Sequence, residues 1–364
     1  MSVRAQQGVQ RWVREEVRAL SAYHVPEADG AIKLDAMENP YSWPEEMVDE
    51  WLERLRHVTL NRYPDPAARS LTPALRAALA VPDGAQLLLG NGSDELIQLL
   101  CLAVGGPGRT LLTPEPGFSM YAMIARFTGT AYHGVPLKAD FSLDGPGMLA
   151  AISEHQPALV FIAWPNNPTG NLFDAQTLRE ILRAAPGLVV IDEAYTAFAG
   201  ESFLPELAQW PNLLVMRTLS KVGLAGLRLG LLAGAPAWLE QLDKLRLPYN
   251  VNVLTQVSAT FALAHADVLE AQARRIVRDR EALQRELQRR EGFEVFPSSA
   301  NFLLARVPAG RAGEFHAGLR ERGVLVKCLH GAHPMLGDCL RITVGTAAEN
   351  RALLAALDQM LAPE

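Results

Sequence analysis

The spacing of apolar positions along the central part of the chain predicts a layered α/β fold. Short apolar runs of strand length alternate with amphipathic stretches of helical period. The predicted strands are residues 86–89, 109–113, 131–135, 159–163, 188–191 and 213–216. The predicted helices cover residues 71–80, 93–104, 118–128 and 174–185. This alternation indicates a mostly parallel sheet with helices on both faces.

The two ends of the chain have a different pattern. An amphipathic helix is predicted at 8–20, followed by an irregular segment at 21–45 that is rich in Pro, Asn and Tyr. An Arg-rich helical stretch runs from about 255 to 290. Further strands are expected at 293–296, 301–307, 324–328 and 339–344, with helices at 311–322 and 347–361. We therefore expect an N-terminal arm (1–45) joining a small α+β domain (251–364), beside a large domain (46–250).

Composition excludes several classes of protein. The chain has 364 residues, 49% of them apolar, and a net charge of −6, which gives no electrostatic reason to bind nucleic acid or an anionic membrane. No apolar run approaches the length of a membrane span, and the charged N-terminus does not resemble a secretory signal. Cys101, Cys328 and Cys339 are scattered, which predicts neither disulfides nor a metal site. A cytoplasmic protein is expected.

Four polar turns each follow a predicted strand. The turn at 90–95, Gly-Asn-Gly-Ser-Asp-Glu, opens a helix and could bind an anion there, or Ser93 or Asp94 could simply cap that helix. The turn at 164–170, Trp-Pro-Asn-Asn-Pro-Thr-Gly, is either an ordinary turn or a rigid set of amide donors. In open α/β sheets, ligands bind where such turns meet, beyond the carboxyl ends of the strands.

The other two turns add an amine and a carboxylate. Lys221 lies in Thr-Leu-Ser-Lys and is one of five lysines among 34 basic residues, although a solvated loop lysine would fit as well. Asp192 ends an apolar run and could be a plain cap. Taken together, the four turns supply a phosphate cradle, an amine, a carboxylate and amide donors. That inventory suits pyridoxal phosphate.

Longer motifs show a family resemblance. Thr-Leu-Ser-Lys at 218–221 with Ala-Gly-Leu-Arg at 225–228, Asn-Arg-Tyr-Pro at 61–64 and Cys-Leu-Arg-Ile-Thr at 339–343 resemble those of fold-type-I aminotransferases. Among these enzymes the chain resembles the histidinol-phosphate aminotransferases. The resemblance implies a large domain with a mostly parallel sheet sandwiched by helices, a smaller α+β domain, and pyridoxal 5'-phosphate as cofactor.

The resemblance also implies roles at the cofactor. Lys221 would bind it covalently and move the substrate proton, and Asp192 would hold its pyridine nitrogen. Tyr195 and Asn167 would contact the ring hydroxyl, and Phe118 would stack on the ring. The phosphate would be held by Ser93, Asp94, Thr218, Ser220 and Arg228. Tyr63 would reach the phosphate of a neighbouring subunit, which implies a homodimer with shared active sites.

Substrate residues follow from the same resemblance. Arg341 would bind the α-carboxylate of the amino donor as a planar fork. The other substrate positions are Tyr23, Asn39, Asn301 and Lys327. The implied reaction converts L-histidinol phosphate and 2-oxoglutarate to imidazole acetol phosphate and L-glutamate, in histidine biosynthesis.

Other functions stay open on the sequence. On the same fold, the enzyme could be an aromatic amino acid aminotransferase or a threonine-phosphate decarboxylase. Outside enzymes, the alternatives are a regulator that holds the cofactor without catalysis and a binding protein without the cofactor. Regulators of that kind usually carry an added DNA-binding domain, for which this chain has no spare length.

Overall fold

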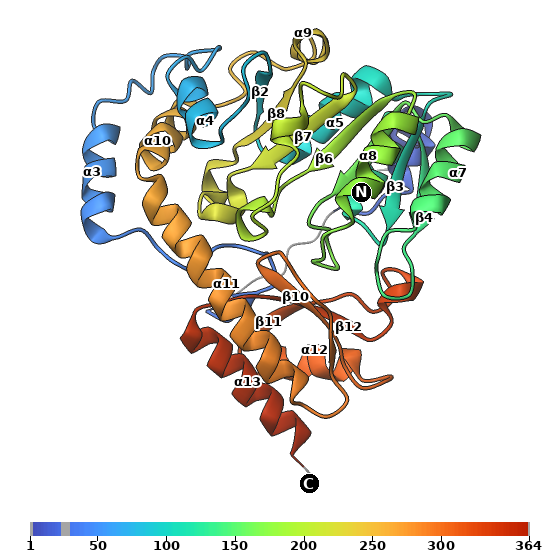
Figure 1. The fold of residues 1–364 in the computed structure, drawn as a ribbon, viewed down its shortest axis with the longest axis vertical. Coiled ribbons are helices and arrows are strands. Elements are labelled where there is room, and N and C mark those ends of the chain that lie inside the picture. The colour runs from blue at the N-terminus through green and yellow to red at the C-terminus, as the bar shows by residue number, and fades with distance from the viewer. Residues whose placement is uncertain (1–2, 23–29, 363–364) are drawn as a thin grey trace.

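The computed structural model describes residues 3–22 and 30–362, which fold around two β-sheets (Figure 1). The larger sheet has seven strands in the order β2-β8-β7-β6-β5-β3-β4. Its strands are β2 (Gln86–Gly90), β3 (Thr110–Glu115), β4 (Ala131–Pro136), β5 (Leu159–Ala163), β6 (Leu188–Asp192), β7 (Leu213–Thr218) and β8 (Gly230–Gly234). Strand β8 runs antiparallel to β2 and β7, and the other neighbouring strands pair in parallel. The predicted α/β class is confirmed.

Helices cover both faces of this sheet because its strands are apolar on both sides. In β6, Leu188 and Val190 belong to a core with α5 (Ser93–Val104) and α6 (Ser119–Thr128), whereas Val189 and Ile191 belong to a core with α7 (Gly145–His155) and α8 (Ala175–Ala184). Alternate residues of a strand point to opposite faces, so the continuous apolar run predicts this burial. The helices of this part are α4 (Leu71–Ala78), α5 (Ser93–Val104), α6 (Ser119–Thr128), α7 (Gly145–His155), α8 (Ala175–Ala184), α9 (Pro236–Asp243) and α10 (Val253–Ala264).

The smaller sheet has five strands in the order β1-β11-β12-β10-β9. They are β1 (Ile32–Leu34), β9 (Glu294–Val295), β10 (Phe302–Arg306), β11 (Val324–Cys328) and β12 (Cys339–Thr343). The helices α11 (Ala266–Gln288), α12 (Ala312–Glu321) and α13 (Ala347–Leu361) pack against it and share its apolar core. Because β1 pairs with β11, the N-terminal segment supplies an edge strand to this sheet.

The structure differs from the predicted elements in several places. Strand β1 lies in the segment predicted to be irregular. The sequence did not reveal it, because a strand of three residues is too short to show a period. The helices α3 (Glu45–Leu55), α7 and α9 and the Gly-flanked strand β8 were missed. The single helical stretch at 255–290 is two helices, α10 and α11, separated at His265.

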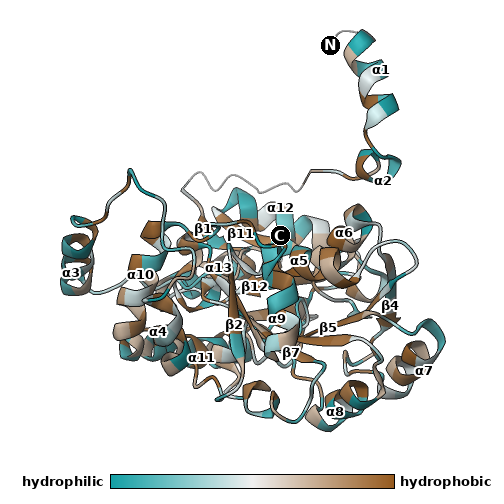
Figure 2. Ribbon diagram, turned by 90° about the horizontal axis from the view of Figure 1, so that it is seen from above, coloured by the Kyte–Doolittle hydropathy of each residue, from teal (hydrophilic) through white to brown (hydrophobic). Residues whose placement is uncertain are grey.

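The helix predicted at 8–20 is also two helices, α1 (Val3–Trp12) and α2 (Glu15–Arg18). Figure 2 shows α1 standing apart from the layered body, whose strands are largely hydrophobic, whereas α2 contacts α6. Arg14, between the two helices, donates a hydrogen bond to the carbonyl of Phe127 at 2.5 Å. In the parts of the chain that the structure describes, none of the helices has the length and apolar character needed to cross a membrane.

Candidate active site

Polar residues from separate strands meet at one edge of the larger sheet. Asp192 ends β6 and Thr218 ends β7, and these strands run in parallel. The reversed strand β8 begins at this edge, where Gly230 pairs with both Gly90 and Thr218. The antiparallel strand therefore brings the residues that precede it, including Arg228, to the edge where the other strands end.

A cavity of about 390 Å³ lies at this edge. Met37 and Glu38, from the N-terminal segment, form part of its wall. The predicted cofactor residues that line it are Ser93, Asp94, Phe118, Asn167, Asp192, Tyr195, Thr218, Ser220, Lys221 and Arg228. The sequence thus predicted most of one side of the cavity, although these residues are spread over more than a hundred positions.

Lys221 lies in a short 3-10 helix, Ser220–Val222, directly after β7. Its ammonium nitrogen Nζ lies 5.8 Å from the centroid of the Tyr195 ring. Burial lowers the pKa of Lys221 to about 8, and the charge of Arg341 adds to this lowering. At neutral pH the amine is therefore neutral, and nucleophilic, far more often than that of an ordinary lysine.

Asp192 is buried, and both of its carboxylate oxygens accept hydrogen bonds. Oδ2 accepts from the hydroxyl of Tyr121 at 2.6 Å, and Oδ1 accepts from the backbone N–H of Ala194 at 3.1 Å. Burial raises the pKa of Asp192 to about 6, and the bond from Tyr121 opposes this rise. The carboxylate is therefore charged above about pH 6, in a place where its charge can hold a cation.

Sequence reasoning missed the role of Tyr121. It is fully buried, lies 4.6 Å from the ring of Phe161 in a stacked arrangement, and meets Phe118 edge-on at 5.4 Å. Tyr121 follows Phe118 by three residues at the start of α6, a spacing that places two side chains on one helix face. This three-residue spacing is the feature of the sequence from which the contact between the two rings could have been predicted.

A second missed feature is the buried ion pair between Glu193 and Arg217. The guanidinium of Arg217 lies 2.8 Å from a carboxylate oxygen of Glu193, which also accepts from the hydroxyl of Ser202 at 2.9 Å. Glu193 follows β6 and Arg217 belongs to β7, so the pair ties together the two strand ends that carry Asp192 and Thr218. A buried pair with these additional hydrogen bonds fixes geometry rather than adding much stability.

A hydrogen-bonded chain connects the two sheets through Asn167 and Tyr195 of the cavity wall. Arg341, on β12 of the smaller sheet, donates from Nη1 to Oδ1 of Asn167 at 2.7 Å and from Nη2 to the carbonyl of Asp35 at 3.1 Å. Asn167 in turn donates from Nδ2 to the Tyr195 hydroxyl at 3.2 Å. The guanidinium thus lies at the junction of the larger sheet, the smaller sheet and the N-terminal segment.

Hydroxyl, amide and guanidinium groups crowd together at the start of α5. A Cβ atom added to Gly92 would lie 2.7 Å from Nη2 of Arg228, and one added to Gly230 would lie 2.7 Å from the backbone nitrogen of Ser93. Glycine permits both approaches, and the positive φ of 86° at Gly92 also favours glycine there. Arg228 also pairs with the carboxylate of Asp94 at 3.3 Å. The result is a compact donor cluster at a helix N-terminus, which favours a phosphate.

The remaining predicted residues are not among those that line the cavity. Asn301 is buried and donates to the carbonyl of Met37 at 2.9 Å, so it supports the wall from behind. Asn39 donates to Gln272 at 2.8 Å. Lys327, on β11, lies opposite Arg341, on β12, in the backbone register of the smaller sheet. Tyr63 is 80% exposed, and Tyr23 lies outside the described residues.

This donor set fits pyridoxal phosphate. The cluster at Gly92 and Arg228 suits a phosphate, Lys221 suits its aldehyde, and the charged Asp192 suits a protonated ring nitrogen. The sequence profile of the family described as aminotransferase class I and II matches residues 29–357. The chain is therefore an aminotransferase of this class, and pyridoxal phosphate is its cofactor.

Individual relatives narrow the family further. The chain is 58% identical to histidinol-phosphate aminotransferase 2 of Nitrosococcus oceani, over 96% of this chain and 97% of that protein. It is 53% identical to histidinol-phosphate aminotransferase of Chromobacterium violaceum, over 96% and 98%. The fold matches the crystal structure of histidinol-phosphate aminotransferase from Sinorhizobium meliloti in complex with pyridoxal-5'-phosphate, with a TM-score of 0.85, 25% identity, and 97% and 98% coverage. The chain belongs to the histidinol-phosphate aminotransferase family, as its motifs predicted.

Proposed function

We propose that this enzyme transfers an amino group between L-histidinol phosphate and 2-oxoglutarate, giving imidazole acetol phosphate and L-glutamate. The observation that carries the proposal is the meeting of Lys221, Asp192 and the phosphate-type donor cluster in one cavity, with Arg341 hydrogen-bonded to Asn167 in its wall. The names of relatives that are more than half identical over nearly the whole chain support the choice of substrate. The reaction would serve histidine biosynthesis.

The bound cofactor supplies an aldehyde for the amine and a ring that accepts an electron pair from the substrate α-carbon. Lys221 is proposed to hold the cofactor covalently and, once its Nζ is released, to take the α-proton of the donor. A lysine with a pKa of about 8 is neutral often enough to act as that base. Asp192, fixed by Tyr121 and Ala194, would keep the ring nitrogen protonated.

The phosphate would be held by the hydroxyls of Ser93, Thr218 and Ser220 and by Arg228. Asp94 fits this role through its backbone N–H at the start of α5, because its carboxylate would repel a phosphate and instead pairs with Arg228. Asn167 and Tyr195 would donate to the ring hydroxyl oxygen. Phe118 would stack on the ring.

The substrate end would be built by other parts of the chain. Arg341 would exchange its contact with Asn167 for the α-carboxylate of glutamate, which its planar fork matches. Lys327, opposite Arg341 in the sheet register, is proposed to attract the substrate phosphate. Tyr23, Asn39 and Asn301 complete the proposed set. A domain of residues 46–250 would bind the cofactor, and the arm (1–45) with residues 251–364 would form the substrate end.

A homodimer with shared active sites is part of the proposal. Tyr63 is proposed to reach the cofactor phosphate of a second copy, and it is exposed together with the apolar side chains of Leu60 and Leu247. Exposed leucines of this kind would be stabilised by burial against a partner. Sedimentation of the loaded enzyme should give the mass of two chains.

The decisive test of the function is a half-reaction. The enzyme, loaded with pyridoxal phosphate, is mixed with L-histidinol phosphate or with phenylalanine, and conversion of the cofactor to its amine form is followed by absorbance. We expect rapid conversion with histidinol phosphate and much slower conversion with phenylalanine. The reverse preference would favour an aromatic aminotransferase, and release of carbon dioxide from threonine phosphate would favour the decarboxylase.

A further inference from the structure

Two tyrosines form an exposed stack, and one of them, Tyr249, lines a pocket together with residues of strand β2. The rings of Tyr63 and Tyr249 lie with centroids 4.5 Å apart and planes inclined by 15°. Tyr63 is 80% exposed and Tyr249 is 40% exposed. A side chain as exposed as Tyr63 would ordinarily sample several rotamers, so the stack limits its conformational freedom.

The backbone of Tyr249 is strained. Its φ angle is 63°, in the left-handed region that is unfavourable for a bulky side chain. Such a conformation persists only where the surroundings enforce it. A glycine or an asparagine at this position would adopt the same backbone with less strain, yet the chain has a tyrosine there.

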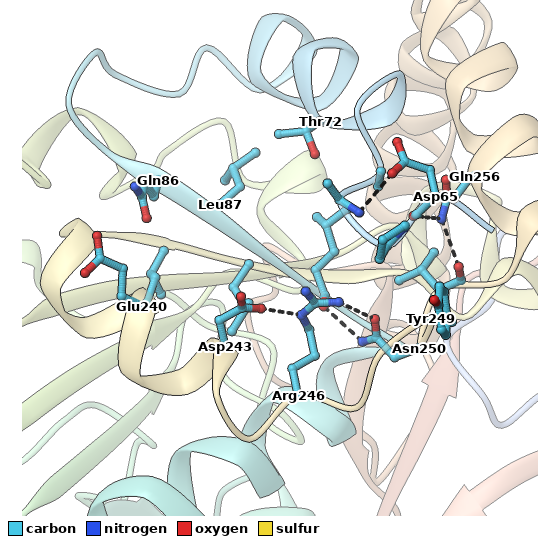
Figure 3. Close-up of a pocket in the computed structure, with 17 residues that line it drawn as sticks. Asp65, Thr72, Gln86, Leu87, Glu240, Asp243, Arg246, Tyr249, Asn250 and Gln256 are labelled. Atoms are coloured by element: carbon cyan, nitrogen blue, oxygen red, sulfur yellow. Dashed lines mark hydrogen bonds and ion pairs between the residues drawn. The ribbon is translucent and has the colours of Figure 1, made fainter. Parts of the chain in front are cut away.

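Asn250, the next residue, supplies that enforcement (Figure 3). Its Nδ2 donates to the carbonyl of Leu89 at 3.1 Å and to Oε2 of Glu95 at 2.8 Å. Its Oδ1 accepts from Nη1 of Arg246 at 2.9 Å, and Arg246 is held in turn by Asp243 at 2.6 Å. The turn at Tyr249 is therefore pinned to the end of β2 and to helix α5.

The same network reaches the proposed phosphate cradle. Oε2 of Glu95 also accepts from the backbone N–H of Asn91 at 2.5 Å. Asn91 lies in the turn between β2 and α5, next to Gly92 and Ser93. The Tyr249 turn and the cradle are thus two parts of one hydrogen-bonded unit, joined through Asn250 and Glu95.

We propose that Tyr249 is a positioning residue for the reaction: its ring holds Tyr63 in the orientation from which the Tyr63 hydroxyl binds the cofactor phosphate of a second copy. This inference rests on the role proposed above for Tyr63. Tyr249 is not among the residues that line the cavity of its own subunit, and it would act through its partner ring. Asn250 fixes the strained turn that presents the ring, relative to the cradle of its own subunit.

The test is a double-mutant cycle read out as cofactor affinity. The full-length enzyme is loaded with pyridoxal phosphate, and the dissociation constant is measured by visible absorbance after serial dilution. The variants are Tyr63→Leu, Tyr249→Leu, the double variant and the conservative Tyr249→Phe. We expect Tyr63→Leu to weaken binding about tenfold, as for the loss of a hydrogen bond to a charged group. Tyr249→Leu should weaken it about fivefold, from loss of the aromatic stack.

Two further expectations separate positioning from a structural role. Tyr249→Phe keeps the stack and should retain the affinity of the unmodified enzyme. In the Tyr63→Leu background, Tyr249→Leu should have no further effect, because there is no phenol left to position. If Tyr249→Leu does not fold, Tyr249→Gly replaces it, since glycine adopts the positive φ without strain and should give the same weakening.

Several outcomes overturn the inference. An unchanged dissociation constant in Tyr249→Leu or Tyr249→Gly, beside a weakened Tyr63→Leu, overturns it while the proposed role of Tyr63 stands. The same conclusion follows if Tyr249→Leu weakens binding equally with and without Tyr63. An unchanged constant in Tyr63→Leu overturns both, and failure of the unmodified enzyme to convert histidinol phosphate would concern the proposed function alone.

Discussion

The two sides of the cavity are built in different ways. On the side of the larger sheet, Asp192 and Thr218 each end a strand, and Lys221 follows within a few residues. On the side of the smaller sheet, Arg341 lies in the middle of β12 and reaches across to Asn167. The first side is made of short local segments, and the second depends on how two distant parts of the chain approach each other.

This difference separates chemistry from substrate selection. The groups proposed for the chemistry are held by buried hydrogen bonds, such as those from Tyr121 and Ala194 to Asp192. The groups proposed for the substrate are two cations on a separate sheet, Arg341 and Lys327, which lie opposite each other on neighbouring strands. Loss of a group on the first side should stop the reaction with any substrate, whereas loss on the second should weaken particular substrates.

The largest effect is expected for Lys221→Ala. Without an amine to hold the cofactor and carry the α-proton, turnover should fall at least about 10³-fold. Steady-state rates and the absorbance of the bound cofactor measure this. Lys244→Ala is the matched control, because Lys244 is exposed, contacts Gln241 and is not among the residues that line the cavity. Substantial steady-state turnover by Lys221→Ala would remove the assignment on which the whole comparison depends.

The sequence predicted the larger-sheet side because each of its residues follows a recognisable apolar strand. It could not show that β8 is reversed, which is what brings Arg228 to the same edge. It also could not show that Asn301 supports the Met37 backbone, since that contact joins residues 264 positions apart. Local periodicity finds strands and the turns after them, but contacts between the sheets depend on tertiary packing that no short window records.

The next largest effect is expected for Asp192→Asn. Loss of the charge beside the ring nitrogen should slow proton abstraction about 100-fold, within the range for acid–base groups. Rapid mixing with the amino donor measures that step. Tyr121→Phe is the informative companion: the bond from Tyr121 lowers the pKa of Asp192, so its loss should raise that pKa above about 6 and move the acid limb of the rate profile to higher pH. An unshifted acid limb would mean that Tyr121 only packs.

A smaller and more selective effect is expected for Arg341→Ala. Loss of a two-pronged ionic contact should weaken glutamate at least about 30-fold in the half-reaction. Cofactor affinity should stay close to that of the unmodified enzyme, because Arg341 belongs to the smaller-sheet side of the cavity and the cofactor residues belong to the larger-sheet side. Arg306→Ala is the matched control, since Arg306 lies on the neighbouring strand β10 and pairs with Glu294. Equal losses of glutamate and cofactor binding would erase the distinction between the two sides.

The smallest effect concerns Lys221, whose pKa depends on groups from both sides of the cavity. Its pKa of about 8 arises first from burial and second from the charge of Arg341. Because the neutral amine reacts, the rate at which the cofactor-free enzyme captures pyridoxal phosphate should rise about fivefold from pH 7 to 8 and less than about twofold from pH 8 to 9. A lysine with an ordinary pKa would instead give about tenfold at each step. Stopped-flow absorbance across this range distinguishes the two.

In Arg341→Ala the repelling charge is gone, so the pKa of Lys221 should rise and the midpoint of the rate profile should move to higher pH. Arg341→Lys keeps a positive charge and should keep the midpoint at lower pH. A midpoint that is the same in the unmodified enzyme and in both Arg341 variants would show that burial alone sets the reactivity of Lys221. The smaller-sheet side would then act only on substrates.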